Sequence, residues 1–510
     1  MRVAEPLPAN AAAMPRRGFS QRDALVSGVV VLATLIVLVA STDDIVWGPY
    51  LPLLALAAFL GFLDSARLLR GKAGFMDPGA LLGFLFLPML LVAPVKQLAW
   101  DYWPFVPELT DSLRWIDLWA ALNLAGMLLY RFGLRTRLRI RGEGMARAPR
   151  VWLPRSRRLF VFLLVAALLV GLAAQAYIYA HFGGIGGFVR TFTERQDAGA
   201  AEFDPFEGLG VPMILADSFK IMLSIALVHL FQDKPYARSM LFFVAMMGFL
   251  FVVFLLFGGL RGSRSATLFS LFCAAGLYHL KIRRLGLKVL ALSLALSVGF
   301  MGAYYWYKTL GLEGFSASTG ASARATLSDK RGSVGQYVVA RDLGRMDVQV
   351  LALRDVNTDA GPGYALGRTY LASVFSIVPR SVVPFKPDQI TREKTELIRG
   401  RGSYMPGEPR QTTLVLGQFG EAFVNFSYPG VLLFYLLLGV LVRRIRTLAT
   451  TLDRADLRLY LVPGLVLIPI LMVITDMNVI FQQLVRYLLV PSLVVLAATT
   501  RIRRPPERLP

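Results

Sequence analysis

The stretch that decides the fold is MLFFVAMMGFLFVVFLLFGG at residues 240–259, which contains no charged side chain. A helix of that length spans about 30 Å, the thickness of the hydrocarbon core of a bilayer. The whole chain has the same character, since 55% of its 510 residues are hydrophobic and only 17% are charged. This composition excludes a soluble globular enzyme, a disordered protein and a secreted disulfide-stabilised domain.

Apolar runs of similar length recur along most of the chain, and short polar loops separate them. We therefore predict an all-α polytopic membrane protein with about twelve transmembrane helices. The predicted spans are 24–41, 46–64, 78–95, 115–130, 159–181, 209–231, 240–259, 266–280, 289–307, 413–442, 459–475 and 478–499.

The net charge of +22 is distributed very unevenly over the loops. The N-terminal tail, every second loop and the C-terminal tail together hold 32 Lys and Arg residues, whereas the short loops on the other side hold six. The positive-inside rule therefore places both termini in the cytoplasm. The basic run from Arg131 to Arg141 is predicted to anchor lipid headgroups, and no nucleic-acid partner is expected because the basic residues flank spans.

Residues that bind metals or form disulfides are scarce. The chain has one cysteine, Cys273, and its three histidines (His181, His229 and His279) are far apart in sequence. No intrachain disulfide, metal site or cofactor is expected from this pattern.

One polar segment, residues 309–412, breaks the regular alternation and is predicted to lie outside the cytoplasm, between spans nine and ten. A loop of this length in a compact protein is usually functional. We expect residues 336–356 to form an amphipathic helix and residues 370–378 a short helix that touches the membrane surface. The predicted segments are 1–23 (N-terminal tail), 24–130 (four-helix membrane segment), 131–158 (basic loop), 159–308 (central membrane segment), 309–412 (outer loop domain), 413–499 (C-terminal membrane segment) and 500–510 (C-terminal tail).

Charged residues within predicted spans are the first candidates for function, because each costs roughly 2.5–3.5 kcal/mol at a helix centre. Asp217 and Lys220 are three residues apart and can pair on one helix face. Arg486 lies about 12 Å along the last span from its outer end. It either neutralises Asp217 or Asp117 inside the bundle or lines a polar cavity.

Two groups of cations are predicted on the outer side. Arg261 and Arg264 lie among glycines in the sequence GGLRGSRS at residues 258–265, and Arg380 and Lys386 lie in the large loop. Glycine lets a backbone approach a phosphate, and arginine offers a two-pronged donor. The alternative for the first group is a tight turn with two exposed arginines.

The start of the tenth span carries Glu421 and, one turn later, Asn425, so both lie on one helix face at the outer boundary. The alternative is an acid that favours the positive end of a helix dipole, with Thr412 as the cap.

In these residues the chain resembles the O-antigen polymerase, or oligosaccharide repeat-unit polymerase (Wzy-type), family. The resemblance covers roughly residues 155–500. It departs from the family pattern at Ser427, where a glycine is expected directly after Asn425-Phe426. The matching motifs are GGIGGF at 183–188 with Arg195, GSR at 262–264, IVPR at 377–380 with Lys386-Pro387, and GEAFVNF at 420–426.

The resemblance implies an inverting, GT-C-like glycosyltransferase in the bacterial cytoplasmic membrane. It would transfer a growing glycan from one polyprenyl-diphosphate carrier to the next lipid-linked repeat unit at the outer face. The partners would be that lipid-linked oligosaccharide, membrane lipids and a chain-length regulator. Glu421 is the candidate general base and Asp342 the second candidate. Arg261, Arg264, Arg380 and Lys386 would stabilise the diphosphate leaving group without a metal, and Asp217, Lys220, Arg486 and Asn425 would line a polar cavity.

Three other classes stay open. An O-antigen-ligase-like transferase would be expected to use a histidine in the large loop, and residues 309–412 contain none. A transporter or lipid-glycan flippase predicts related halves and short outer loops. A non-catalytic scaffold gives no reason for Arg486 or for the outer arginines.

A reporter fusion tests the predicted side of the large loop. An alkaline phosphatase fused after Ala360 should be active and a green fluorescent protein fused there should be dark, because the loop is expected outside the cytoplasm. The same fusions in the basic loop at residues 141–149 should give the opposite signals. A fluorescent fusion after Ala360 would overturn the topology.

Overall fold

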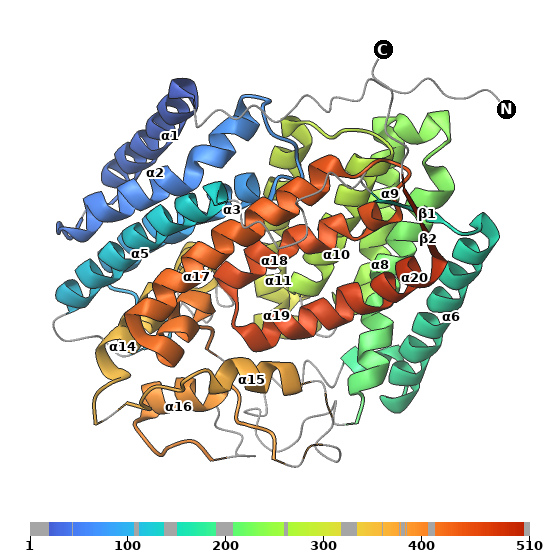
Figure 1. Ribbon diagram of the computed structural model, residues 1–510. Helices are drawn as coiled ribbons and strands as arrows, with labels where there is room; N and C mark the ends of the chain where they lie inside the picture. Colours follow the sequence, from blue (N-terminus) through green and yellow to red (C-terminus); the bar gives the residue numbers. More distant parts are fainter. Residues whose placement is uncertain are drawn as a thin grey trace.

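The computed structural model describes residues 20–42, 44–106, 112–136, 150–189, 208–259, 264–317, 334–359, 361–376, 378, 383, 385–405 and 414–503. Helices dominate (Figure 1). The first half of the chain contains α1 (Gln21–Ala40), α2 (Tyr50–Leu69), α3 (Pro78–Leu87), η1 (Pro88–Val92), α4 (Ala93–Ala99), α5 (Ser112–Arg135), α6 (Arg157–His181), α8 (Gly210–Phe231), η2 (Pro235–Arg238) and α9 (Met240–Leu256). The second half contains α10 (Arg264–Lys281), α11 (Leu287–Ala317), α13 (Val334–Gln336), η4 (Tyr337–Leu343), α14 (Met346–Asp355), α15 (Arg368–Phe375), α16 (Thr391–Arg399), α17 (Gly417–Thr451), η5 (Leu457–Tyr460), α18 (Val462–Ile474), α19 (Met477–Leu484), η6 (Val485–Leu489) and α20 (Val490–Ala498).

Seven helical segments among the described residues are long and apolar enough to cross a membrane. They are Gln21–Ala40, Tyr50–Leu69, Pro78–Ala99, Arg157–His181, Gly210–Phe231, Gly417–Thr451 and Met477–Ala498. Shorter apolar helices occupy Met240–Leu256, Leu287–Ala303 and Val462–Ile474. The prediction of a mainly helical membrane protein is confirmed, and the number of twelve crossings stays a prediction.

The buried side chains form two large cores that divide the membrane helices into two lobes. The first core joins α1, α2, α3, η1, α5 and α17 from Phe419 to Val442, and it also includes side chains of α14 and α16. The second joins α6, α8, α9, α10, α18, α19 and α20. The lobes meet where α17 packs against α18 and where α3 packs against the same helix.

In the first lobe, α5 and α17 approach closely because glycines face the partner backbone. A Cβ added to Gly133 would lie 2.4 Å from the carbonyl oxygen of Leu436, and one added to Gly439 would lie 2.2 Å from that of Tyr130. Small residues at a helix contact are typical of membrane bundles, where association depends on packing.

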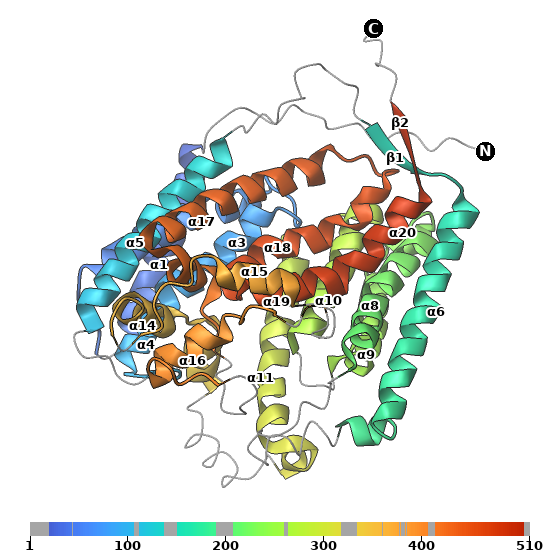
Figure 2. The same cartoon turned by 60° about the horizontal axis from the view of Figure 1, so that its bottom comes forward.

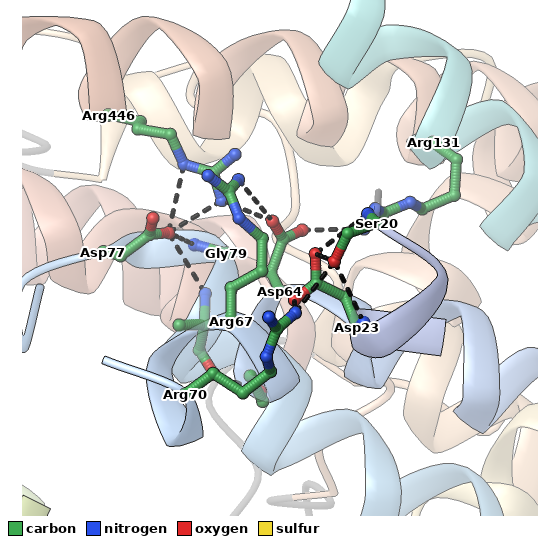
Figure 3. Close-up of polar contacts among 11 residues, drawn as sticks. Ser20, Asp23, Asp64, Arg67, Arg70, Asp77, Gly79, Arg131 and Arg446 are labelled. Atoms are coloured by element: carbon green, nitrogen blue, oxygen red, sulfur yellow. Dashed lines mark hydrogen bonds and ion pairs between the residues drawn. The ribbon is translucent and has the colours of Figure 1, made fainter. Parts of the chain in front are cut away.

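Ion pairs tie several helix ends together at one end of the bundle, which we call the basic end (Figure 3). The buried carboxylate of Asp64 lies 2.7 Å from Arg131 Nη1 and 2.9 Å from Arg446 Nη2. Arg446 also reaches Asp77 at 2.7 Å, and Arg70 pairs with Asp23 at 2.5 Å. Arg131 was expected to contact headgroups with the rest of its basic run, but it is buried against Asp64, so this part of the expectation is wrong.

A two-stranded antiparallel sheet lies at the basic end, formed by β1 (Arg150–Pro154) and β2 (Thr499–Arg503). Its register pairs Trp152 with Arg501. This sheet was not predicted from the sequence, because neither strand shows the alternating pattern that marks a half-buried strand. The sheet joins the polypeptide before α6 to the polypeptide after α20.

The large loop folds onto the opposite end of the bundle, which we call the loop end (Figures 1 and 2). Helix α14 is buried along almost its whole length and packs against α5 and α17. The predicted single helix at 336–356 is wrong: the chain forms the π-helix η4, breaks at Gly344 and Arg345, and continues as α14. The helix predicted at 370–378 is present as α15, but it packs against α19 and α17.

Helix α17 is interrupted at Phe426 and Ser427, so its first nine residues form a separate helical segment. Ser427 has φ +58° and ψ −152°, a conformation that is essentially reserved for glycine. Its hydroxyl oxygen accepts a hydrogen bond from the Tyr364 hydroxyl at 3.1 Å. The strain is therefore held by contacts from the large loop, and the predicted continuous span 413–442 is corrected to a broken helix that begins at Gly417.

Substitutions at Ser427 test this strain. Ser427→Gly should raise the melting temperature in detergent, because relief of roughly 1–3 kcal/mol of backbone strain outweighs the loss of one neutral hydrogen bond worth roughly 1 kcal/mol. Ser427→Ala is the matched control, since it loses the same hydrogen bond and keeps the Cβ atom, and it should lower the melting temperature. A glycine variant no more stable than the alanine variant would contradict the strain.

Candidate functional site at the loop end

Two acidic side chains connect the first turns of α17 and α19 at the loop end. Asp476, which precedes α19, accepts hydrogen bonds at Oδ1 from the backbone N–H groups of Leu416 and Gly417, both at 3.0 Å. In return, Glu421 of α17 accepts at Oε2 the backbone N–H of Met477, the first residue of α19, at 2.6 Å. Each acid thus satisfies donors that the other helix leaves unpaired at its positive end.

Glu421 is fully buried and is also bound to the large loop. Its Oε1 accepts the Thr369 hydroxyl at 2.8 Å, and its Oε2 also accepts Gln418 Nε2 at 2.8 Å. Asn425, one turn later, donates to Thr369 Oγ1 at 2.7 Å and accepts the backbone N–H of Gly367 at 2.8 Å. The predicted pair Glu421 and Asn425 therefore shares a helix face, and that face holds α15 in place.

Helix α16 supplies charged groups around this junction. Lys394 Nζ lies 3.0 Å from Asp476 Oδ2, which neutralises a second buried carboxylate near Glu421. Arg368, the first residue of α15, pairs with Glu393 and approaches Asp388, to which Arg392 also lies close at 3.6 Å. Burial lowers the pKa of the Arg368 guanidinium, and the neighbouring Arg392 adds to the effect.

A line of half-buried polar side chains runs from this junction along α19 toward the middle of the bundle. Asn478, Gln482 and Arg486 are spaced by four residues, so they follow one helix face. Asn478 donates to Gln389 of the large loop at 2.7 Å, and Gln482 donates to Asn478 at 2.9 Å. We call these three residues the α19 polar stripe, and they provide the kind of surface that hydroxyl-rich ligands bind.

The stripe ends at the charges within the second lobe. Asp217 and Lys220 are fully buried and pair at 2.8 Å. Arg486 Nε lies 3.8 Å from the other carboxylate oxygen of Asp217. The structure thus brings together the three charged residues that the sequence analysis assigned to a polar cavity, whereas Asn425 belongs to the junction with Glu421.

A cavity of about 30 Å³ lies near the junction, between α5, α14 and α17. Trp119 donates to Gln349 Oε1 at 2.8 Å beside it, and Gln349 donates to the carbonyl of Leu416 at 2.7 Å. Behind it, burial raises the pKa of Asp347 to about 6, although the N–H of Val348 and the charge of Arg345 oppose this shift. This part of the loop is therefore a packed support and has space for no more than water.

The predicted cations of the phosphate cradle are only partly within the described residues. Arg261 and Arg380 lie outside them, and Arg264 begins α10 with a side chain that is not described. Lys386 is half-buried in an extended part of the loop, and Asp342 is half-buried in η4. Convergence of these cations on one point stays a prediction.

Among the described residues, no group of three or more His, Cys, Asp or Glu side chains could hold a metal ion. The acids at the junction are used instead to accept hydrogen bonds from two helix starts and an ion pair from Lys394. The metal-independent mechanism stays a prediction.

Three residues of the junction, Thr369, Lys394 and Asp476, were not predicted from the sequence. For Asp476 a signal was present, because an aspartate directly before an apolar helical run is a common N-cap. In the structure Asp476 caps the other helix, α17. No local sequence pattern predicts the roles of Thr369 and Lys394, because their partners Glu421 and Asp476 are 52 and 82 residues away.

No protein-family model matches the chain, and no curated protein or solved structure matches it.

The hydrogen bonds of Glu421 favour a positioning role over proton transfer, and one substitution separates the two. Glu421→Gln should lower the melting temperature by several degrees, because an amide nitrogen in place of either carboxylate oxygen faces at least one donor, the Thr369 hydroxyl at Oε1 or two N–H donors at Oε2, at a cost of roughly 1–3 kcal/mol. Thr369→Val should lower it less, and the exposed Asp359→Asn is the neutral control. A Glu421→Gln protein with unchanged melting temperature and no activity would instead identify a general base.

Proposed function

We propose that the protein is a membrane glycosyltransferase that polymerises lipid-diphosphate-linked oligosaccharide repeat units at the outer face of the bacterial cytoplasmic membrane. The product would be an O-antigen or an exopolysaccharide. The observation that carries the proposal is the junction at the loop end, where the large loop, α17 and α19 meet above a polar stripe that enters the membrane. The sequence resemblance to the O-antigen polymerase family supplies the reaction.

The distribution of Lys and Arg residues supports the proposal that the junction lies on the outer side of the membrane. The basic end carries the ion pairs of Asp64, Asp77 and Asp23 and the strands β1 and β2, and it coincides with the loops that contain most Lys and Arg residues. We infer that the basic end faces the cytoplasm and that the chain crosses the membrane twelve times. The junction then faces outward, where lipid-linked repeat units would be joined.

The chemistry makes three demands on such a site. A diphosphate leaving group develops negative charge and needs fixed cations, a role that we propose for Arg261, Arg264, Arg380 and Lys386. The glycan needs hydroxyl-binding groups, which Asn478 and Gln482 can provide. The acceptor hydroxyl needs a base. The three hydrogen bonds that the oxygens of Glu421 accept favour a positioning role for this residue, and Asp342 stays the second candidate for the base.

Sizing of lipid-linked glycans in a deletion strain tests this function. Complementation with the wild-type gene should give long polymer, whereas Arg264→Ala or Arg380→Ala should leave single lipid-linked units, because the leaving group loses its stabilising charge. Arg401→Ala is the matched control, since this arginine is exposed in the same loop and should leave polymer length unchanged.

The other outcomes point to other classes. Capped polymer that accumulates on its carrier in the deletion strain would indicate a ligase, and repeat units trapped in the cytoplasm would indicate a flippase. Normal chain lengths with both arginine variants would contradict the proposed phosphate cradle.

A further inference from the structure

In the middle of the second lobe, the described residues place two cations, Lys220 and Arg486, against one carboxylate. Lys220 already neutralises Asp217 at 2.8 Å, with both side chains fully buried. Arg486 is left with a 3.8 Å contact to the same carboxylate, and its side chain is 26% exposed. A cation inside a membrane bundle is costly without an anionic partner of its own.

The backbone of Arg486 is fixed while its side chain is weakly held. Arg486 belongs to the π-helical turn η6, a distortion that often occurs at functional sites. Its carbonyl oxygen accepts the Ser218 hydroxyl at 2.7 Å, which ties this turn to α8. By contrast, the guanidinium has no contact with a carboxylate shorter than 3.8 Å among the described residues.

The path to Arg486 is polar and begins at the proposed site. Arg486 lies nine residues after Met477, roughly 14 Å along the helix from the junction. Asn478 and Gln482 lie on the same helix face between the junction and Arg486, and Gln389 of the large loop contacts Asn478. A guanidinium at the inner end of such a path can bind a phosphate oxygen with two parallel donors.

We propose that Arg486 is an anion site that binds a phosphate group of the polyprenyl-diphosphate carrier, with Asp217 left paired to Lys220. This inference rests on the proposed function, because that function supplies the carrier. A phospholipid headgroup offers the same phosphate chemistry, so the test compares the two. Arg486 therefore extends the outer cations with a contact inside the membrane region.

Binding can be measured with the full-length protein in phosphatidylcholine nanodiscs and undecaprenyl diphosphate as the probe. Arg486→Gln should weaken binding by about tenfold or more, because a charge-assisted, two-pronged contact is lost. The affinity of Arg486→Lys should lie between those of the wild type and Arg486→Gln, since lysine keeps the charge but not the planar donor. Arg114→Gln, at an exposed arginine at the start of α5, is the control and should bind like the wild type.

A second variant separates anion binding from internal pairing. The double substitution Asp217→Asn with Lys220→Met removes the buried pair as a neutral unit, so Arg486 keeps its charge without a competing carboxylate. We expect this protein to bind undecaprenyl diphosphate at least as tightly as the wild type. Melting temperatures measured for every variant show that each protein is folded.

Several outcomes would overturn the inference. A folded Arg486→Gln protein that binds with the wild-type Kd would do so, and so would weaker binding by the double variant. Phosphatidylglycerol that competes equally, with the same dependence on Arg486, would assign the site to a headgroup. The proposed function fails separately, when the deletion strain still makes normal polymer whatever the binding result.

Discussion

The structure depends on one reciprocal arrangement, in which two helices cap each other with buried acids. Asp476 binds the first N–H groups of α17, and Glu421 binds the first N–H of α19. Neither acid could be buried alone, because an isolated buried carboxylate is very costly. Lys394 from α16 and Thr369 from α15 complete the arrangement, so the large loop is held by the same interactions that orient the two membrane helices.

This junction also connects the two lobes. Helix α17 belongs to the first core and α19 to the second, and the hydrogen bond from Met477 to Glu421 crosses between them. A glycan bound along Asn478 and Gln482 would therefore lie next to the contact that fixes the lobes. Arg486 and Asp217 lie at the far end of the same stripe, where α19 continues into η6 and packs on α8.

Much of the fold could be predicted from the sequence, because the bilayer restricts the chain to structures whose backbone polar groups are hydrogen-bonded internally. Long apolar runs and the asymmetry of Lys and Arg indicated the helical membrane class, and the spacing of Glu421 and Asn425 indicated a shared face that the structure contains. The glycine expected after Asn425-Phe426 falls at Ser427, where the backbone adopts a glycine-like conformation. What the sequence could not indicate was tertiary pairing. The burial of Arg131 against Asp64 and the cap from Asp476 to α17 join residues that are 67 and 60 positions apart, and no local periodicity encodes such distances.

The composition of the first core has a consequence for biosynthesis. Its helices α1, α2 and α5 leave the ribosome long before α14 and α17, which complete the same core. The glycine face of α5 and the carboxylate of Asp64 must therefore wait in the membrane while roughly 300 further residues are translated, and Arg131 can neutralise that carboxylate during the delay. Insertion of the early helices and their final docking are thus separate events, and a truncated chain that ends before α17 would leave the first lobe half assembled.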